Sequence, residues 1–219
     1  MPGVLFDIDG TLVTFKFDVQ GTRRALIEEL ARSGLDTSGL DLGSPTQRIM
    51  DAAKEQTHKA GAGVSFGDLK KRLYSILDEF EVESSRQAEV FPGAKETLLR
   101  LRNVGIHLAV LTNSGRKAAY SVLRKGDMLD CFEFVLTRED VDTMKPSPDG
   151  ILKAVSKFSL PKSEVCYVGD GILDIVAAKA AGMRVISVAT GTQPATRLRE
   201  EGADRVISSL EELPEVLGV

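Results

Sequence analysis

The chain contains no tryptophan, only two cysteines and few aromatic residues among its 219 positions. Two cysteines are too few for a disulfide framework or a four-ligand zinc site. Cys131 and Cys166 both lie in apolar runs, so we expect them to be small core residues. With aromatic residues at 5%, we do not expect a surface that stacks the bases of single-stranded nucleic acid.

An excess of positive charge is also missing. The chain has 28 Lys and Arg against 32 Asp and Glu, a net charge of −4, whereas duplex-binding proteins normally carry a basic face. No apolar run approaches the roughly 18 residues of a membrane-spanning helix, and the N-terminus lacks the basic start of a signal peptide. We therefore expect a cytoplasmic protein with no nucleic-acid or membrane partner.

From residue 93 onward, short apolar runs alternate with segments of helical periodicity. The expected strands are 106–111, 132–136, 165–168, 185–188 and 205–207, with helices between them. Gly105 and Gly182 follow two helical segments, where glycine commonly ends a helix. Ser114, and Ser147 followed by Pro148, are expected to start helices. This alternation predicts a parallel sheet covered on both faces.

A long helical segment interrupts this pattern near the N-terminus. Val4–Ile8 is an expected strand, but the next one does not come until Ile106. The helices expected between them start at Asp18, Ser44-Pro45 and Ser65, and end near Gly34, Gly61 and Phe80. The sequence therefore predicts an α/β fold: a Rossmann-like core of residues 1–14 and 89–219, with an all-helical domain inserted at 15–88.

Polar side chains follow four of the predicted strands. In chain order these are Asp7 and Asp9, Thr112 and Asn113, Lys145 after a loop, and Asp170 with Asp174. Ligands of open parallel sheets bind at the carboxyl ends of the strands. The first two carboxylates share a face and repel each other unless a cation intervenes. Singly, Asp170 could be a helix cap and Lys145 a loop lysine, but together the residues predict one cation-dependent site.

These segments resemble the motifs of the haloacid-dehalogenase superfamily. Asp7-Ile8-Asp9-Gly10-Thr11 is similar to its first motif (DxDGT), Leu111-Thr112-Asn113 to its second, Lys145-Pro146 to its third, and Gly169-Asp170 with Asp174 to its fourth (GDxxxD). Their order and spacing resemble the phosphoglycolate phosphatase-like branch, whose helical cap lies between the first and second motifs. The resemblance covers the whole chain, but the cap matches only in length and helical character.

The resemblance implies a Mg²⁺-dependent phosphatase that hydrolyses a small phosphorylated metabolite through an aspartyl-phosphate. Asp7 would be the nucleophile, because an aspartate is ionised at neutral pH without a general base. Asp9 would protonate the leaving group and then deprotonate the attacking water.

The remaining roles concern the metal and the phosphoryl group. The resemblance implies that Asp7, the backbone carbonyl of Asp9 and Asp170 hold Mg²⁺, with Asp174 as a supporting residue that orders metal-bound water or Lys145. Lys145 would neutralise charge between the nucleophile and the phosphoryl group. Thr112, with the Asn113 amide, would bind the phosphoryl oxygens.

Several alternatives stay open. Asp9 argues against a dehalogenase, because a leaving halide needs no proton. A phosphomutase similar to β-phosphoglucomutase, or a pyrophosphatase, would use the same residues. A phospho-aspartate switch or a phosphate-binding module is the alternative without turnover, although receiver domains lack an inserted cap. Phe15 and Lys16 depart from the family pattern where the cap linker would overhang the site, so the substrate is left open.

Overall fold

The chain divides into two compact units. The computed structural model describes residues 2–14, 16–59 and 63–219. One unit, the core unit, consists of Met1–Phe15 and Ser85–Val219, and the other, the helical unit, is Lys16–Ser84. Phe15, and Gly61 at the expected end of the second helix, lie outside the described residues. The division into domains at residues 15 and 88 stays a prediction.

The core unit is built on one six-stranded sheet. Its strands are β1 (Gly3–Phe6), β2 (His107–Leu111), β3 (Phe134–Leu136), β4 (Val165–Gly169), β5 (Arg184–Val188) and β6 (Arg205–Ile207). They pair in the order β3-β2-β1-β4-β5-β6, and every pair is parallel. The chain order reverses at β1, the kind of switch point where open sheets form a crevice at their carboxyl ends. The predicted α/β fold with a parallel sheet is confirmed.

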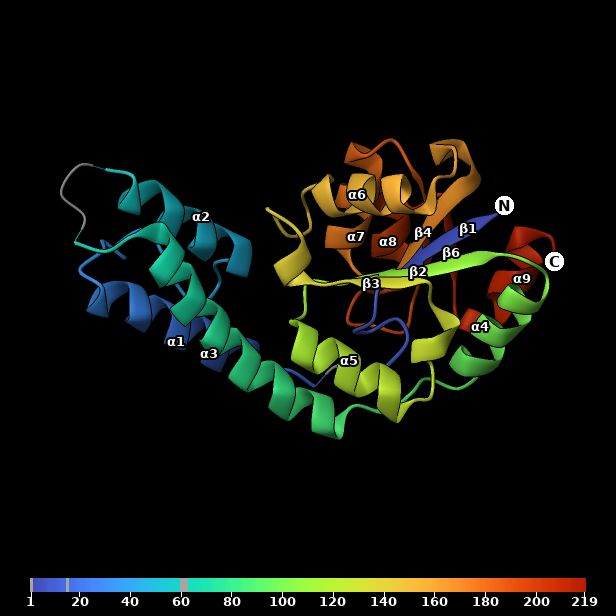
Figure 1. Ribbon diagram of the computed structural model, residues 1–219, viewed down its shortest axis with the longest axis horizontal. Coiled ribbons are helices and arrows are strands. Elements are labelled where there is room, and N and C mark those ends of the chain that lie inside the picture. The colour runs from blue at the N-terminus through green and yellow to red at the C-terminus, as the bar shows by residue number, and fades with distance from the viewer. Residues whose placement is uncertain (1, 15, 60–62) are drawn as a thin grey trace. The chain divides into compact units, whose positions relative to one another are not determined.

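Helices cover both faces of this sheet (Figure 1). One face carries α4 (Ala94–Asn103), α5 (Arg116–Lys125) and α9 (Leu213–Leu217), and the other carries α6 (Asp149–Phe158), α7 (Ile172–Ala180) and α8 (Ala195–Glu200). Short 3-10 helices lie at Leu129–Cys131, Arg138–Asp140, Lys162–Glu164 and Leu210–Glu212. Successive residues of β4 face alternate layers: Cys166 and Val168 pack with the first set of helices, Val165 and Tyr167 with the second. This burial on both sides explains why the strands are continuously apolar.

The helical unit contains no strand among its described residues. Its helices are α1 (Val19–Arg32), α2 (Thr46–Thr57) and α3 (Phe66–Gln87), the last of which continues into the core unit. As predicted, the Asp18 side chain caps α1 by accepting a hydrogen bond from the Gly21 N–H at 2.8 Å. Ser65 starts α3 by accepting one from the Asp68 N–H at 3.1 Å.

Besides the start predicted at Ser114, which is described with the site below, two predicted helix starts were wrong. Ser44 does not cap α2, which begins after Pro45. Its hydroxyl instead accepts a hydrogen bond from the Asp41 N–H at 3.0 Å, because a serine can serve a local turn as readily as a helix end. The helix expected to have Pro148 as its first residue begins at Asp149, with Pro148 as the cap. Both errors move a helix boundary by one residue and leave the helices themselves in place.

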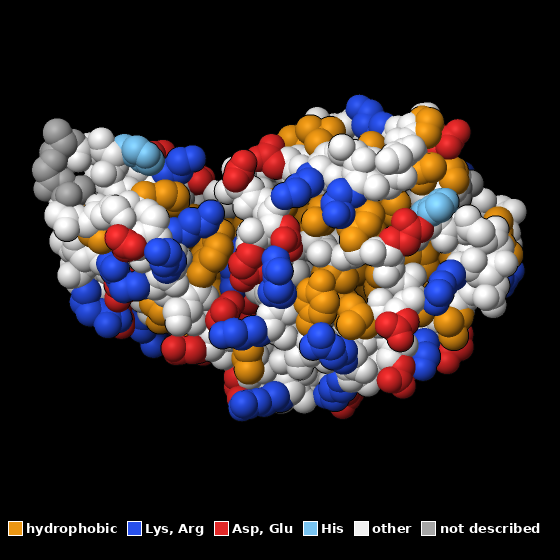
Figure 2. Space-filling view, viewed as in Figure 1, with side chains coloured by type: hydrophobic (Ala, Val, Ile, Leu, Met, Phe, Trp, Pro, Cys, Tyr) orange, Lys and Arg blue, Asp and Glu red, His pale blue; other side chains and the backbone are white. Residues whose placement is uncertain are grey.

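The two cysteines are buried and unpaired, as predicted. No described helix has the length and apolar character needed to span a membrane. On the face drawn in Figure 2, Lys and Arg side chains are interspersed with Asp and Glu.

Candidate active site

The loop after β1 carries the first two acidic residues. The Asp7 N–H donates to the carbonyl of Val168 at 2.9 Å, so Asp7 still follows the sheet although β1 ends at Phe6. The chain then turns at Gly10, whose φ of +80° favours glycine. A Cβ at Gly10 would lie 2.3 Å from the Asp170 carboxylate. Glycine is therefore required here both by backbone conformation and by the close approach of the β4 loop.

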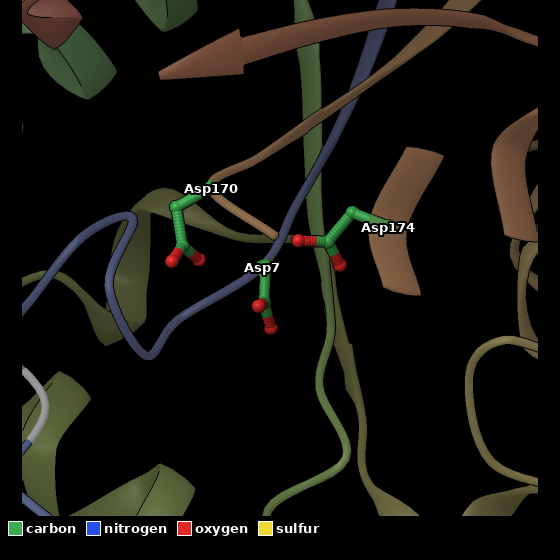
Figure 3. Close-up of side chains that lie close together, drawn as sticks. All are labelled: Asp7, Asp170 and Asp174. Carbon is green, nitrogen blue, oxygen red and sulfur yellow. The ribbon is translucent and has the colours of Figure 1, made fainter. Parts of the chain in front are cut away.

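Three carboxylates meet at this edge of the sheet. Asp7 comes from the end of β1, Asp170 from the end of β4 and Asp174 from the first turn of α7 (Figure 3). One oxygen of each lies within 4.8 Å of the others. Asp7 and Asp174 are buried, and Asp170 is half-buried. Residues from three separate elements thus place their negative charge in one small volume.

The electrostatics of this group favour a cation. Burial, followed by the charge of Asp174, raises the pKa of Asp170 to about 7. Burial also raises the pKa of Asp7 well above its usual value, and the nearby Lys145 offsets this only in part. The set of three carboxylate oxygens suits Mg²⁺, which prefers oxygen ligands and would relieve the repulsion. The residues present therefore fit the predicted metal.

Lys145 lies directly beside this group. Its Nζ is 3.0 Å from Oδ1 of Asp7 and 2.7 Å from Oδ1 of Asp174. The lysine is buried, which by itself would lower its pKa, but the Asp174 and Asp7 carboxylates outweigh burial and raise the pKa above its usual value. Lys145 is therefore a fixed positive charge in contact with the candidate nucleophile. Asp174, predicted as a supporting residue, contacts Lys145 as expected.

In the second motif, the Asn113 side chain is engaged by the backbone of Lys145. The side-chain amide of Asn113 donates to the carbonyl of Lys145 at 3.0 Å, and its oxygen accepts from the Lys145 N–H at 2.9 Å. The Asn113 side chain thus holds the segment that carries Lys145. Thr112 is buried, and its hydroxyl accepts a hydrogen bond from the Ser114 N–H at 3.0 Å.

Ser114 is a site residue that sequence reasoning missed. It was predicted to cap α5, but α5 begins after Gly115, and the Ser114 hydroxyl donates to Oδ2 of Asp9 at 2.5 Å. Burial raises the pKa of Asp9, while the hydrogen bond from Ser114 lowers it in part. The one feature of the sequence that could have indicated this role is the position of Ser114, two residues after Thr112.

Tyr167 was also missed. It is the only residue of β4 with a polar side chain, and it is fully buried. Its hydroxyl lies 2.9 Å from Nζ of Lys145 and 3.1 Å from Oδ1 of Asp174. The sequence could have indicated this role, because Tyr167 is a single tyrosine in an otherwise apolar strand and lies three residues before Asp170.

A profile of haloacid dehalogenase-like hydrolases matches residues 4–188. The chain belongs to the haloacid dehalogenase-like hydrolase family. The resemblance predicted from the four motifs is therefore confirmed, and the match includes every candidate site residue named above.

Individual relatives of this hydrolase extend over nearly the whole chain. A phosphoglycolate phosphatase of Nitrosococcus oceani is 27% identical over 98% of this chain and 95% of its own length. A candidate pyrophosphatase of Caldanaerobacter subterraneus is also 27% identical, over 98% of this chain and 93% of its own. The crystal structure of a hydrolase from Pseudomonas syringae, 24% identical, shares the fold with a TM-score of 0.70 over 100% of this chain and 99% of that one.

Proposed function

We propose that this family member is a Mg²⁺-dependent phosphatase that hydrolyses a small phosphate monoester through an aspartyl-phosphate formed on Asp7. One observation carries the proposal: Asp7 lies at the end of the central strand, in contact with Lys145 and beside two further carboxylates. The phosphoglycolate phosphatase that is 27% identical over nearly the full chain supports the same class of substrate.

The first chemical step belongs to Asp7 and Asp9. A carboxylate oxygen of Asp7 attacks phosphorus, and the bond from phosphorus to the ester oxygen breaks. Asp9, whose pKa is raised by burial, supplies a proton to the departing oxygen. The resulting carboxylate of Asp9 then takes a proton from the water that hydrolyses the aspartyl-phosphate. Ser114 donates to one oxygen of Asp9 and would hold this carboxylate in place for both proton transfers.

The metal would be held by Asp7, the backbone carbonyl of Asp9, and Asp170. Asp174 lies close to Asp7 and Asp170 and contacts Lys145. It would therefore be a supporting residue that orients Lys145 and the ligands of the metal. When bound, Mg²⁺ supplies positive charge that offsets repulsion between a phosphate dianion and the carboxylates.

Thr112 and Asn113 would bind the phosphoryl oxygens. Because the Asn113 side chain is engaged with Lys145, we assign its contribution to the backbone N–H, with the hydroxyl of Thr112 as the second donor. These donors, together with Lys145, stabilise the charge that develops on the transferring group.

The helical unit, Lys16–Ser84, would act as the cap domain that selects the substrate. A phosphorylated metabolite in the cytoplasm is the expected partner. A pyrophosphatase is the second candidate, because a candidate pyrophosphatase matches this chain as well as a phosphoglycolate phosphatase does. A phosphomutase and a phospho-aspartate switch or phosphate-binding module are the remaining alternatives.

Phosphate release from an aryl phosphate, pyrophosphate and a panel of small phosphate esters tests the proposal. We expect steady turnover with Mg²⁺, a loss of turnover with EDTA, and the highest kcat/KM on a monoester. Asp142→Asn is a matched control, because Asp142 is an exposed aspartate of the core unit. Turnover that is indifferent to EDTA would contradict the proposal, and a single turnover would indicate a switch. Preference for pyrophosphate would favour the second candidate.

A further inference from the structure

The loop that follows β5 reaches the edge of the sheet where the three carboxylates lie. β5 ends at Val188 and α8 begins at Ala195, and we call residues 189–193 between them the β5 loop. β4 and β5 are neighbours in the sheet, so this loop leaves the sheet beside the one that carries Asp170. The β5 loop contains no charged residue and lies outside the four motifs. Its contacts with two segments of the site therefore need a separate explanation.

Thr190 joins the β5 loop to the turn after β1. Its hydroxyl donates a hydrogen bond to the carbonyl of Gly10 at 2.6 Å, across 180 positions of the sequence. Gly10 has a φ of +80°, and a glycine has more backbone freedom than any other residue, so a turn at this position needs to be held from outside. The hydroxyl of Thr190 supplies such a hold.

The same turn is held from its other side. The Gly10 N–H donates to the carbonyl of Val13 at 2.8 Å. This N–H belongs to the same planar peptide group as the carbonyl of Asp9. The two hydrogen bonds made by the backbone of Gly10 therefore fix the direction in which the Asp9 carbonyl, a proposed ligand of the metal, points.

Gly191 lets the β5 loop touch Asp170. A Cβ built on Gly191 would overlap Oδ2 of Asp170 and would lie 3.0 Å from its Cβ. Gly191 has no positive φ, so the lack of space alone requires glycine at this position. The distance to the Cβ of Asp170 stays the same however the carboxylate is turned. The close approach is therefore a property of the two backbones.

Asp170 thus lies in a gap between two loops. A Cβ on Gly10 would also overlap its carboxylate, and in Figure 3 the loop that follows β1 passes beside Asp170. The Thr11 hydroxyl of that loop donates to Oδ1 of Asp170 at 3.2 Å. Since Thr190 ties the β5 loop to Gly10, its hydrogen bond sets the width of this gap.

A magnesium site is sensitive to such placement. Mg²⁺ requires nearly ideal octahedral geometry, so a small shift of its ligands weakens binding. Residues that orient metal ligands without touching the metal typically change its affinity by about 10- to 100-fold when they are replaced.

We infer that the β5 loop positions the metal site: the hydroxyl of Thr190 fixes the turn that carries the Asp9 carbonyl, and Gly191 leaves the space in which Asp170 lies. The inference rests on the Mg²⁺ site of the proposed function. It adds a segment that none of the four motifs contains. Thr190 and Gly191 are positioning residues, because they act through Gly10 and Asp170.

The first test compares Thr190→Val with Thr192→Val. Valine keeps the shape of threonine and removes only the hydroxyl, and Thr192 is an exposed threonine of the same loop. By isothermal titration calorimetry, Thr190→Val is expected to raise the Kd for Mg²⁺ by about tenfold or more. Thr192→Val should have the Kd of the wild type. Thr190→Ser keeps the hydroxyl and should stay within about twofold of the wild type.

Gly191→Ala tests the second contact without altering Thr190. It is expected to raise the Kd for Mg²⁺ by at least about tenfold, because the new Cβ displaces Asp170 or the loop. Gly39→Ala is the matched control, since Gly39 has no positive φ and no atom within 4 Å of an added Cβ. It should bind Mg²⁺ as the wild type does.

Two further readouts separate positioning from a structural role. With an aryl phosphate, the Mg²⁺ concentration for half-maximal turnover of Thr190→Val should rise by the same factor as the Kd, while kcat at saturating Mg²⁺ stays within about twofold of the wild type. A hydroxyl that only stabilises the fold would lower the unfolding temperature in EDTA and leave the Kd unchanged. That result would overturn the inference.

The outcomes also separate the inference from the proposed function. A wild type that binds Mg²⁺ but hydrolyses no phosphate ester would contradict the proposed function alone, and the comparison of Kd values would still decide the role of the β5 loop. A wild type that binds no Mg²⁺ would contradict both. Wild-type affinity in Thr190→Val or in Gly191→Ala, or an equal loss in Thr192→Val, would overturn the inference.

Discussion

Ser114 donates a hydrogen bond to Oδ2 of Asp9 over 2.5 Å, across 105 positions of the sequence. The contact joins the loop after β2 to the loop after β1 and fixes the carboxylate that we propose as acid and base. A hydrogen bond to a carboxylate favours its charged form, so Ser114 lowers the pKa of Asp9 against the effect of burial, which raises it.

Ser114→Ala should therefore raise the pKa of Asp9 further. Because Asp9 works both as acid and as base, we expect the whole pH profile of kcat to move to higher pH and kcat at neutral pH to fall about tenfold. Ser121→Ala, at an exposed serine of α5, is the control. A Ser114→Ala enzyme with the pH profile of the wild type would show that the contact does not act on Asp9 during catalysis.

Asp170 should be needed for the stabilisation of the protein by Mg²⁺. A ligand that binds only the folded state raises the unfolding temperature as its concentration increases. Thermal unfolding at increasing Mg²⁺ concentrations measures this effect. We expect the unfolding temperature to rise with Mg²⁺ in the wild type and in Asp142→Asn, but not in Asp170→Asn. An equal rise in all three proteins would place the metal elsewhere.

The same residue predicts how stability depends on pH when no divalent cation is present. The pKa of Asp170 is raised to about 7 in the folded chain, against about 3.9 for an unfolded aspartate. The folded state therefore binds this proton more tightly. The contribution to stability is complete below about pH 4 and is lost as the pH rises through about 7.

Urea unfolding in EDTA between pH 4 and 8 measures this effect. The free energy of unfolding of the wild type should fall with rising pH over that range, and the fall should be smaller in Asp170→Asn because the titrating group is gone. Asp142→Asn should keep the slope of the wild type. The account would be contradicted by equal slopes in the two variants.

Gly10→Ala should damage the site beyond its cost in backbone strain. Gly10 and Gly105 have φ values of +80° and +82°, so alanine costs about 1–2 kcal/mol of stability at either position. Only at Gly10 would the new Cβ meet a site residue, at 2.3 Å from the Asp170 carboxylate, whereas nothing lies within 4 Å at Gly105.

Thermal unfolding and kcat separate these two effects. Both variants should unfold at a lower temperature than the wild type, but only Gly10→Ala should lose activity and require more Mg²⁺. Equal activity of the two alanine variants would mean that the approach of Gly10 to Asp170 has no part in the site.

Much of the site could be predicted because strand ends are local features. A β-branched, apolar run followed by a polar residue marks the carboxyl end of a strand, and a parallel sheet brings all such ends to one edge. Asp7, Lys145, Asp170 and Asp174 are therefore found together, as predicted. The glycines that end α4 and α7 were predictable for the same reason, since a positive φ is a local requirement.

The contacts within the site could not be predicted in the same way. Ser114 and Asn113 both have local roles open to them, as a helix cap and as a strand-end amide. Each instead bonds to a partner far along the chain, Asp9 or Lys145. Tyr167 has the pattern of a core residue, because only its last atom is polar. The hydrogen-bond partner of such a side chain depends on how distant elements pack together. The spacing of residues in the sequence does not indicate which partner that is.

The most direct test of the account is the mass of the protein quenched in acid during turnover. Asp9→Asn is the suitable variant, because an aryl leaving group needs little help from an acid while hydrolysis of the aspartyl-phosphate still needs a base. The account predicts that one phosphoryl group accumulates on the peptide that contains Asp7, and that Asp7→Asn abolishes both the adduct and turnover. Turnover that persists in Asp7→Asn, with no covalent phosphate in Asp9→Asn, would contradict it.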